Sequence, residues 1–221
     1  HLVESSPVLR QRQASTLAGR NPCWHDSPDT LPLEHPWLLV ANEFFDALPI
    51  EQHLMEKGRW RRRGVHSGAG GWRLATLEPL PCHPFAGHAF VETSPAGAAL
   101  IVDYGSDQPF LKDTLQAVRR HRFQPVLDCP GESDLTSHVD FGVLSEVART
   151  AGLETVHTSQ PQFLVNCGLL HRLARLAGQP GHAEREKAVE RLIHPQAMGH
   201  LFKVLAVIAP GLQRPVPGFS A

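Results

Sequence analysis

The sequence of 221 residues predicts an α/β fold. Apolar runs of strand length alternate with stretches of helical periodicity, a pattern that is typical of a mostly parallel sheet covered on both faces. The chain is long enough for one such domain with a sizeable insertion, and two independent domains are not expected. We therefore predict a single domain over residues 1–221, with an inserted hairpin at about residues 52–80.

Five apolar runs are predicted to be strands because they are short and bounded by turn residues. In chain order they are Leu2–Val3, Trp37–Ala41, Ala99–Asp103, about Thr155–Val165, and Phe202–Ile208.

Helical periodicity predicts the elements between these strands. Capping residues support two of them: Ser5 or Ser6 can cap a helix with Pro7 in its first turn, and Asp140 can cap another that Gly152 closes. The predicted helices are Val8–Leu17, Thr114–His121, Phe141–Ala151, Leu169–Leu176 and a charged helix that ends at His194 and Pro195.

The inserted segment differs from its surroundings in composition, because it has a glycine-rich stretch between two segments of strand length. Gln52–Val65 and Trp72–Leu77 flank the glycine-rich stretch "SGAGG", which predicts an antiparallel hairpin with a glycine tip. We do not interpret these glycines as a nucleotide-binding loop, because no strand-to-helix transition surrounds them.

Charge and composition narrow the class of partner. The 21 basic and 22 acidic residues nearly balance, so no long-range attraction to nucleic acid or to an anionic membrane is expected. No apolar run approaches the roughly 20 residues that a membrane span requires. The four cysteines lie far apart without a CxxC spacing, which favours free thiols in a reducing, intracellular compartment. A small molecule or a protein is the expected partner.

Acidic residues follow three of the predicted strands. They are Glu4 in "HLVES", Glu43 and Asp46 in "ANEFFDALP", and Asp103 in "LIVDYG". Ligands of open parallel sheets bind beyond the carboxyl ends of the strands, where an acid can accept hydrogen bonds from ribose hydroxyls. Acids in such positions are also ordinary helix caps, and both interpretations remain open for each residue taken alone.

The stretch "ANEFFDALP" is the most informative of the three. Asn42, Glu43 and Asp46 place one amide and two carboxylates within a single turn, and Phe44 and Phe45 supply an apolar wall. Carboxylates beside aromatic rings can orient a cationic or amide nitrogen and accept its proton. The alternative is a capped turn whose phenylalanines belong to the core.

Six segments, in order along nearly the whole chain, resemble the MidA family of S-adenosylmethionine-dependent methyltransferases. This family includes bacterial proteins and the mitochondrial arginine methyltransferase that assists complex I assembly. The segments are "VESSPVLRQRQ", "LLVANEFFDALPIEQ", "ALIVDYG", "DTLQAVRRHRF", "PGESDLTSHVDF" and "MGHLFKVLAV".

The resemblance implies a class I methyltransferase sheet of Rossmann type, with S-adenosyl-L-methionine as cofactor and a protein as substrate. It implies that Glu4 holds the cofactor ribose and that "ANEFFDALP" lies beside the sulfonium methyl group. The implied cofactor-binding residues are Glu4, Ser5, Asn42, Glu43 and Phe44, and the implied substrate-binding residues are Phe45, Asp103 and Tyr104.

If the acceptor is an arginine side chain, as the resemblance implies, its positive charge requires carboxylates, and Glu43 and Asp46 are the candidates, with Asn42 beside them. His138 and Asp140 in "SHVDF" are candidates for a general base and the acid that orients it. Asp140 is equally suited to cap a helix, and His138 to bond locally.

Family members carry a glycine-rich loop ahead of the "VESSP" segment, and none precedes Glu4 in this sequence. We therefore expect a complete cofactor site to need sequence upstream of residue 1. A non-catalytic binding or assembly protein that keeps the fold is the main alternative. A metal site built on Cys23 and His25 or on Cys82 and His83 is a weak alternative, because no cluster of three or four ligands is evident and no metal is expected.

The family resemblance also bears on location. A bacterial protein would be cytoplasmic, and a eukaryotic one would lie in the mitochondrial matrix. The hairpin and the C-terminal segment could support a homodimer, which composition does not decide.

Overall fold

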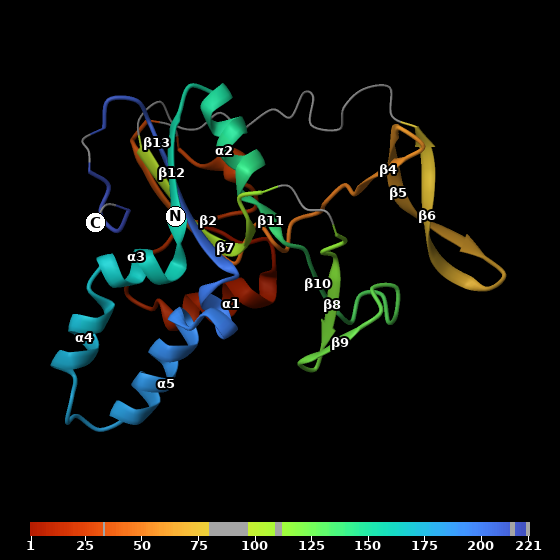
Figure 1. The fold of residues 1–221 in the computed structure, drawn as a ribbon. Helices are drawn as coiled ribbons and strands as arrows, with labels where there is room; N and C mark the ends of the chain where they lie inside the picture. Colours follow the sequence, from red (N-terminus) through yellow and green to blue (C-terminus); the bar gives the residue numbers. More distant parts are fainter. Residues whose placement is uncertain (33, 80–96, 109–111, 213–214, 220–221) are drawn as a thin grey trace.

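The computed structural model describes residues 1–32, 34–79, 97–108, 112–212 and 215–219, and its central feature is a five-stranded sheet (Figure 1). The strand β7 (Gly97–Ser106) pairs with β3 (Trp37–Asn42) and with β13 (Phe202–Ile208), and its last residues pair with β11 (Val139–Asp140). The strand β12 (Glu154–Ser159) pairs with the far side of β13. The predicted α/β class is confirmed.

The sheet is mixed, which corrects the expectation of a mostly parallel one. The strands β3 and β11 run parallel to β7, but β13 runs antiparallel to both β7 and β12. All but one of the residues of β13 are buried, and such a continuous apolar strand has the same sequence signature in either direction. The direction of β13 was therefore invisible in the sequence.

One face of the sheet forms the core with helix α2 (Phe141–Thr150). Cross-strand neighbours Ala41, Ile101 and Leu205 lie in register, and Phe141 and Ala148 of α2 join the same cluster. Alternate residues of a strand point to opposite faces, so this cluster accounts for only half of the apolar side chains of β3 and β7.

The opposite face is open at β3. Leu38 and Val40 are 89% and 72% exposed, and they line an apolar hollow together with Ala98, Leu100 and Val216. The expectation that both faces would be covered is therefore not met at β3 by the residues that the structure describes.

The helices predicted from capping residues are confirmed to within one residue. Helix α1 (Pro7–Thr16) has Ser6 as its N-cap, and the Asp140 side chain caps α2 by accepting from Val143 N. The predicted helices α4 (Leu169–Arg175) and α5 (His182–Ile193) also form, and a π-helical turn η2 (Pro195–Gly199) follows α5.

Two predicted elements were wrong. Residues 114–121, expected to be a helix, contribute β8 (Gln116–Arg119), which forms a three-stranded sheet with β9 (Arg122–Gln124) and β10 (Asp134–Thr136). Arg120 and His121 both have positive φ, the conformation of a two-residue hairpin turn. Such a turn usually contains glycine, and the sequence has none at these two positions. The strand predicted to reach residue 165 ends at residue 159, because Ser159 caps helix α3 (Gln160–Asn166) with a proline in its first turn.

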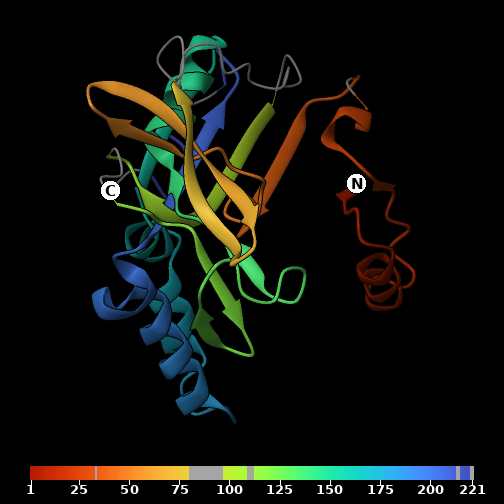
Figure 2. The same cartoon turned by 90° about the vertical axis from the view of Figure 1, so that its right-hand side faces the viewer.

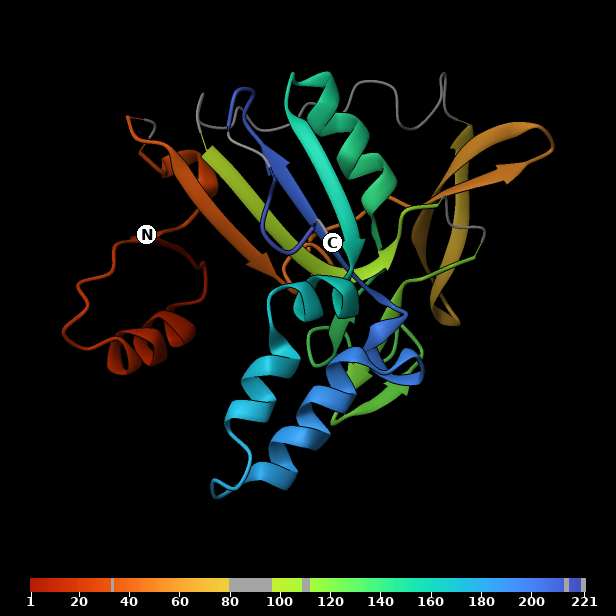
Figure 3. The same cartoon turned by 60° about the vertical axis from the view of Figure 1, so that its left-hand side comes forward.

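The insertion has three strands, β4 (His53–Glu56), β5 (Arg59–Gly68) and β6 (Gly71–Pro79), where two were expected. The added turn lies at Lys57 and Gly58, which both have positive φ. The strands stand away from the main sheet on the side opposite β3 (Figure 3). The end of the expected hairpin, and Cys82 and His83, lie outside the described residues.

The N-terminal residues form a small unit of their own. The strand β1 (Leu2–Val3) pairs in parallel with β2 (Trp24–His25), a strand that was not predicted, and α1 and the short helix η1 (Pro28–Thr30) complete the unit. Figures 2 and 3 show the unit set apart from the main sheet, on the side of β3. Glu4 therefore belongs to a different body of secondary structure from Asn42.

The strands β7 and β11 approach so closely at Gly105 that no side chain fits between them. A Cβ added there would lie 1.9 Å from the carbonyl oxygen of Val139. We expect Gly105→Ala to lower the free energy of unfolding by roughly 1–3 kcal/mol, because the two strands must separate. Urea denaturation would measure this. Gly70→Ala, where a Cβ meets nothing within 4 Å, is the control. Equal stability of the two variants would contradict the prediction.

Candidate functional site

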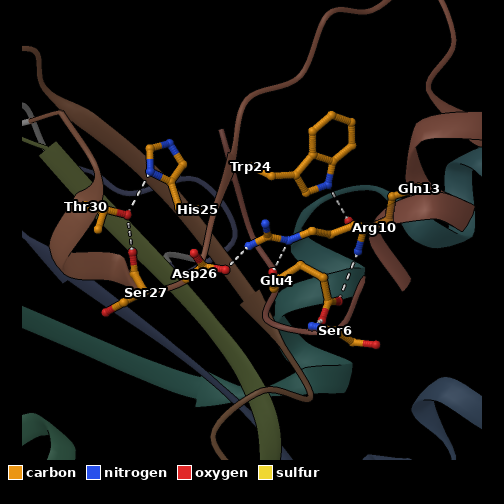
Figure 4. A network of polar contacts seen from close by, with 9 residues as sticks. All are labelled: Glu4, Ser6, Arg10, Gln13, Trp24, His25, Asp26, Ser27 and Thr30. Carbon is orange, nitrogen blue, oxygen red and sulfur yellow. Dashed lines mark hydrogen bonds and ion pairs between the residues drawn. The ribbon is translucent and has the colours of Figure 1, made fainter. Parts of the chain in front are cut away.

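The first candidate residue, Glu4, follows β1 and is held in a hydrogen-bond network (Figure 4). Its carboxylate accepts from Ser6 N at 2.9 Å and from the Gln13 side-chain amide at 3.2 Å. Arg10 donates to the Glu4 backbone carbonyl and pairs with Asp26. Ser5 is exposed beside this network. Glu4 thus lies in a defined orientation at the end of its strand.

The Glu4 carboxylate suits a ribose diol. A carboxylate has about four acceptor positions, and the contacts with Ser6 and Gln13 use two of them. No cation among the described residues forms an ion pair with it. The acceptor capacity that remains is the chemistry that ribose hydroxyls require.

The second group begins where β3 ends. Asn42 is the last residue of β3, and Glu43 N donates to Val102 O at 2.9 Å. Glu43 has a φ of 46°, a left-handed conformation that is uncommon for residues other than glycine. Both side chains are exposed, so the turn presents one amide and one carboxylate at the surface.

Of the two phenylalanine rings that follow, Phe44 lies at the surface and Phe45 lies against the core. The two rings meet edge to face with centroids 5.7 Å apart. Phe44 is 39% exposed, whereas Phe45 packs against the core cluster below α2. Phe44 is therefore placed as the predicted apolar wall would require, whereas Phe45 has the alternative role of a core residue.

The buried Asp103 carboxylate holds this turn against β7. Asp103 is 0% exposed, and its oxygens accept from the backbone N–H groups of Phe45, Asp46 and Tyr104 at 3.1, 3.2 and 2.9 Å. Burial raises the pKa of Asp103 to about 6, and the nearby Asp46 adds to the rise, while the three backbone donors oppose it. Its contacts are those of a residue that supports the turn.

Asp46 and Tyr104 form the polar centre of the site. Asp46 is 6% exposed, and its Oδ2 accepts a hydrogen bond from the Tyr104 hydroxyl. Its Oδ1 is buried and accepts no hydrogen bond from the described residues. Burial, together with the bond to Asp46, raises the pKa of Tyr104 well above its usual range, so the phenol remains a donor.

Side chains of the β8–β11 region surround Tyr104. The Thr136 and Gln116 side chains hydrogen-bond to its hydroxyl and to each other, and the His138 ring lies edge-on to the Tyr104 ring with centroids 5.5 Å apart. Ser137 N donates to Asp46 O, which ties the segment "DLTSHVDF" to the turn after β3. Segments 90 residues apart in sequence thus meet at Asp46 and Tyr104.

His138 directly precedes β11, and Asp140 is the last residue of that strand. Burial lowers the pKa of His138, so its imidazole is neutral at pH 7. Burial also raises the pKa of Asp140, against the opposing effect of the Val143 and Gly142 N–H groups. The helix-capping role of Asp140 is confirmed, and the pairing of His138 with Asp140 as base and orienting acid stays a prediction.

The predicted site residues therefore fall into two groups. Asn42, Glu43, Asp46, Tyr104 and His138 are linked through the contacts above, whereas Glu4 and Ser5 lie in the separate N-terminal unit. Sequence reasoning missed three polar residues that contact these side chains, Gln13, Gln116 and Thr136, and it missed Trp24, which contacts Gln13. Gln13, Gln116 and Thr136 all lie in segments quoted for the family resemblance, so the sequence offered a signal for each of them. The contact of Gln116 was missed because residues 114–121 were expected to form a helix.

Two further features of the described residues bear on the class of site. No group of three or more His, Cys, Asp or Glu side chains there could hold a metal ion. None of the helices described is long and apolar enough to cross a membrane.

The fold is that of an α/β protein with a mixed central sheet, and comparison with known proteins specifies the kind. A family described as "Putative S-adenosyl-L-methionine-dependent methyltransferase" matches residues 1–94 and 82–159. The chain belongs to this family, which confirms the resemblance seen in the sequence, and its cofactor is S-adenosyl-L-methionine.

Curated relatives carry a more specific name. The chain is 29% identical to "Protein arginine methyltransferase NDUFAF7, mitochondrial" of Danio rerio over 94% of its own length, and 30% identical to that of Rattus norvegicus over 94%. It spans 60% and 59% of those proteins. The chain thus corresponds to about three fifths of the curated relatives it matches.

Solved structures show the same fold. A COG1565 superfamily member from Burkholderia thailandensis, bound to S-adenosyl-homocysteine, matches with a TM-score of 0.80 and 29% identity. The match covers 99% of this chain and 65% of that one. A native structure of a COG1565 superfamily protein from the same organism matches with a TM-score of 0.82 and 28% identity.

The raised pKa of Asp103 predicts a pH dependence of stability. A folded-state pKa of about 6 lies above the ordinary value of 3.8, so the native state binds this proton more tightly than the unfolded chain. The contribution of Asp103 to the free energy of unfolding should therefore decrease, by about 2–3 kcal/mol, as the pH rises from 4 to 7.

The measurement is urea denaturation of the wild type and of Asp103→Asn at several pH values. The stability of the wild type relative to the variant should decrease as the pH rises through this range. Asp128→Asn, at an exposed position, is the control. A difference between wild type and Asp103→Asn that does not vary with pH would contradict the assignment.

Proposed function

We propose that this protein transfers the methyl group of S-adenosyl-L-methionine to an arginine side chain of a protein substrate. The observation that carries the arginine assignment is the Asp46 carboxylate, which is held by Tyr104 through one oxygen while the other accepts no hydrogen bond from the described residues. An unsatisfied buried acceptor is costly, and a guanidinium N–H would remove that cost. The names of the curated relatives support the same substrate class.

The family resemblance supports the roles that we propose for the chain's residues. Bound S-adenosyl-L-methionine supplies a methyl group on a positively charged sulfur, which is a good leaving group. Glu4 would hold the ribose, with Ser5 beside it, and Asn42, Glu43 and Phe44 would line the path to the methyl group. Phe45, Asp103 and Tyr104 would shape and support the acceptor side.

Transfer requires a nitrogen nucleophile in line with the S–CH₃ bond. As the N–C bond forms and the S–C bond breaks, the guanidinium must lose one proton. In our proposal the carboxylates of Glu43 and Asp46 hold the guanidinium charge, and the neutral imidazole of His138 accepts the proton. Asp140 would orient that imidazole through the carboxylate oxygen that does not cap α2.

We also assign the main sheet to the class I methyltransferase type, within one domain over residues 1–221 with its insertion at about residues 52–80. The arrangement that supports this is β3, β7 and β12 running in one direction, with the antiparallel β13 between β7 and β12. The family resemblance extends the proposal to a subunit of respiratory complex I as substrate. Homodimerisation stays a prediction, as does the location, which would be the cytoplasm for a bacterial protein and the mitochondrial matrix for a eukaryotic one.

Cofactor binding is the first test. Calorimetric titration with S-adenosyl-L-methionine and S-adenosyl-homocysteine would be done on residues 1–221 and on the protein expressed with any coding sequence that precedes residue 1. We expect saturable binding by the longer form, because the family resemblance implies a glycine-rich loop ahead of Glu4 that completes the cofactor site. Binding by neither form would favour the non-catalytic alternative.

The acceptor carboxylates give the second test. We expect the double variant Glu43→Ala, Asp46→Ala to lower kcat by about 100-fold, because two charge-assisted hydrogen bonds of about 1.5 kcal/mol each are lost. Transfer of radiolabelled methyl groups to arginine-containing peptides, with lysine-containing peptides for comparison, measures the effect. Glu146→Ala, at an exposed position of α2, is the control. Wild-type turnover by the double variant, or methylation of the lysine peptides alone, would overturn the assignment.

A further inference from the structure

The N-terminal unit contains a side chain whose contacts serve the Glu4 carboxylate. Gln13 lies on α1, three residues beyond Arg10, and its amide spans the space between Glu4 and Trp24 (Figure 4). Its Nε2 donates to Glu4 Oε2 at 3.2 Å, and its Oε1 accepts from the Trp24 indole Nε1 at 2.8 Å.

These two contacts determine which way the Gln13 amide points. An indole N–H can only donate, so the amide oxygen must face Trp24. The NH₂ group must then face Glu4, and a flipped amide would break both hydrogen bonds. Gln13 is therefore a donor of fixed direction toward one oxygen of Glu4.

The other Glu4 oxygen is held independently. Ser6 N donates to Oε1 at 2.9 Å, so each carboxylate oxygen has one donor from the start of α1 or its first turns. Arg10 is engaged elsewhere, through Nε with the Glu4 backbone carbonyl and through Nη2 with Asp26. The two donors thus fix the plane of the carboxylate, and no cation among the described residues pairs with it.

We propose that Gln13, anchored by Trp24, is a positioning residue that orients the Glu4 carboxylate toward the cofactor ribose. This rests on the proposed role of Glu4 in holding the ribose. A flexible glutamate loses side-chain entropy when it binds a ligand, and a carboxylate that is already oriented avoids part of that cost. Gln13 would therefore affect the affinity for the ribose hydroxyls without touching the ligand.

The test measures binding, by calorimetry, in the protein expressed with any coding sequence that precedes residue 1. The ligands are S-adenosyl-homocysteine and its 2′,3′-dideoxy analogue, which lacks both ribose hydroxyls. The variants are Glu4→Gln, Gln13→Met, which keeps the length of the side chain without its hydrogen bonds, and the control Gln11→Met at an exposed position of α1.

We expect Gln13→Met to weaken binding of S-adenosyl-homocysteine by about 3–10-fold, the range of one hydrogen bond, and Gln11→Met to leave it unchanged. The dideoxy analogue should bind the wild type and Gln13→Met equally, because the interaction that Gln13 supports is absent from it. A purely structural role of Gln13 would weaken both ligands alike, and that result would overturn the proposal.

The Glu4→Gln variant separates this inference from the role on which it rests. Weaker binding of S-adenosyl-homocysteine by Glu4→Gln, with normal binding by Gln13→Met, would overturn the positioning role alone. Normal binding by Glu4→Gln would remove the ribose-binding role of Glu4 and the positioning role with it. No binding by the wild type would contradict both of these and the proposed methyltransferase function.

Discussion

The buried carboxylate of Asp103 is the interaction on which the rest of the site depends. It accepts three backbone N–H groups, two from the turn after β3 and one from β7, and so joins two neighbouring strands at their carboxyl ends. The charge is costly to bury, as its raised pKa shows, but the three donors would be unsatisfied without it. The position of Asp46, and with it that of the proposed acceptor site, follows from this bond network.

Around that network, contacts distant in sequence complete the site. Tyr104 follows Asp103 directly, so fixing the strand end also directs the phenol to Asp46. The segment before α2 then closes over the same point: Ser137 N bonds to Asp46 O, and β11 pairs with β7 at Gly105, where only glycine allows the close approach. The acidic turn, the phenol and the imidazole of His138 are therefore held by backbone contacts.

In the N-terminal unit, too, hydrogen bonds from neighbouring segments hold a carboxylate in place. Glu4 is oriented by the first turns of the helix that follows it, and Trp24 on the paired strand fixes the amide that does so. The unit and the main sheet are separate in Figures 2 and 3, with the exposed apolar residues Leu38 and Val40 on the strand nearest to it. The two halves of the proposed site are thus each ordered locally.

The sequence by itself determined the α/β class, the helices with clear caps and the acids that follow β1 and β3, because these depend on local periodicity and on neighbouring residues. The third predicted strand exit was wrong, because Asp103 lies inside β7, which continues to Ser106. The family resemblance added the cofactor. Only the tertiary structure decided the direction of β13, the hairpin at Arg120 and His121, and the partners of Asp46, because these depend on which distant segments pair. Local patterns cannot show that Asp103 supports the turn after β3, or that Gln13 faces both Glu4 and Trp24, since hydrogen-bond partners are chosen by the packing of whole elements.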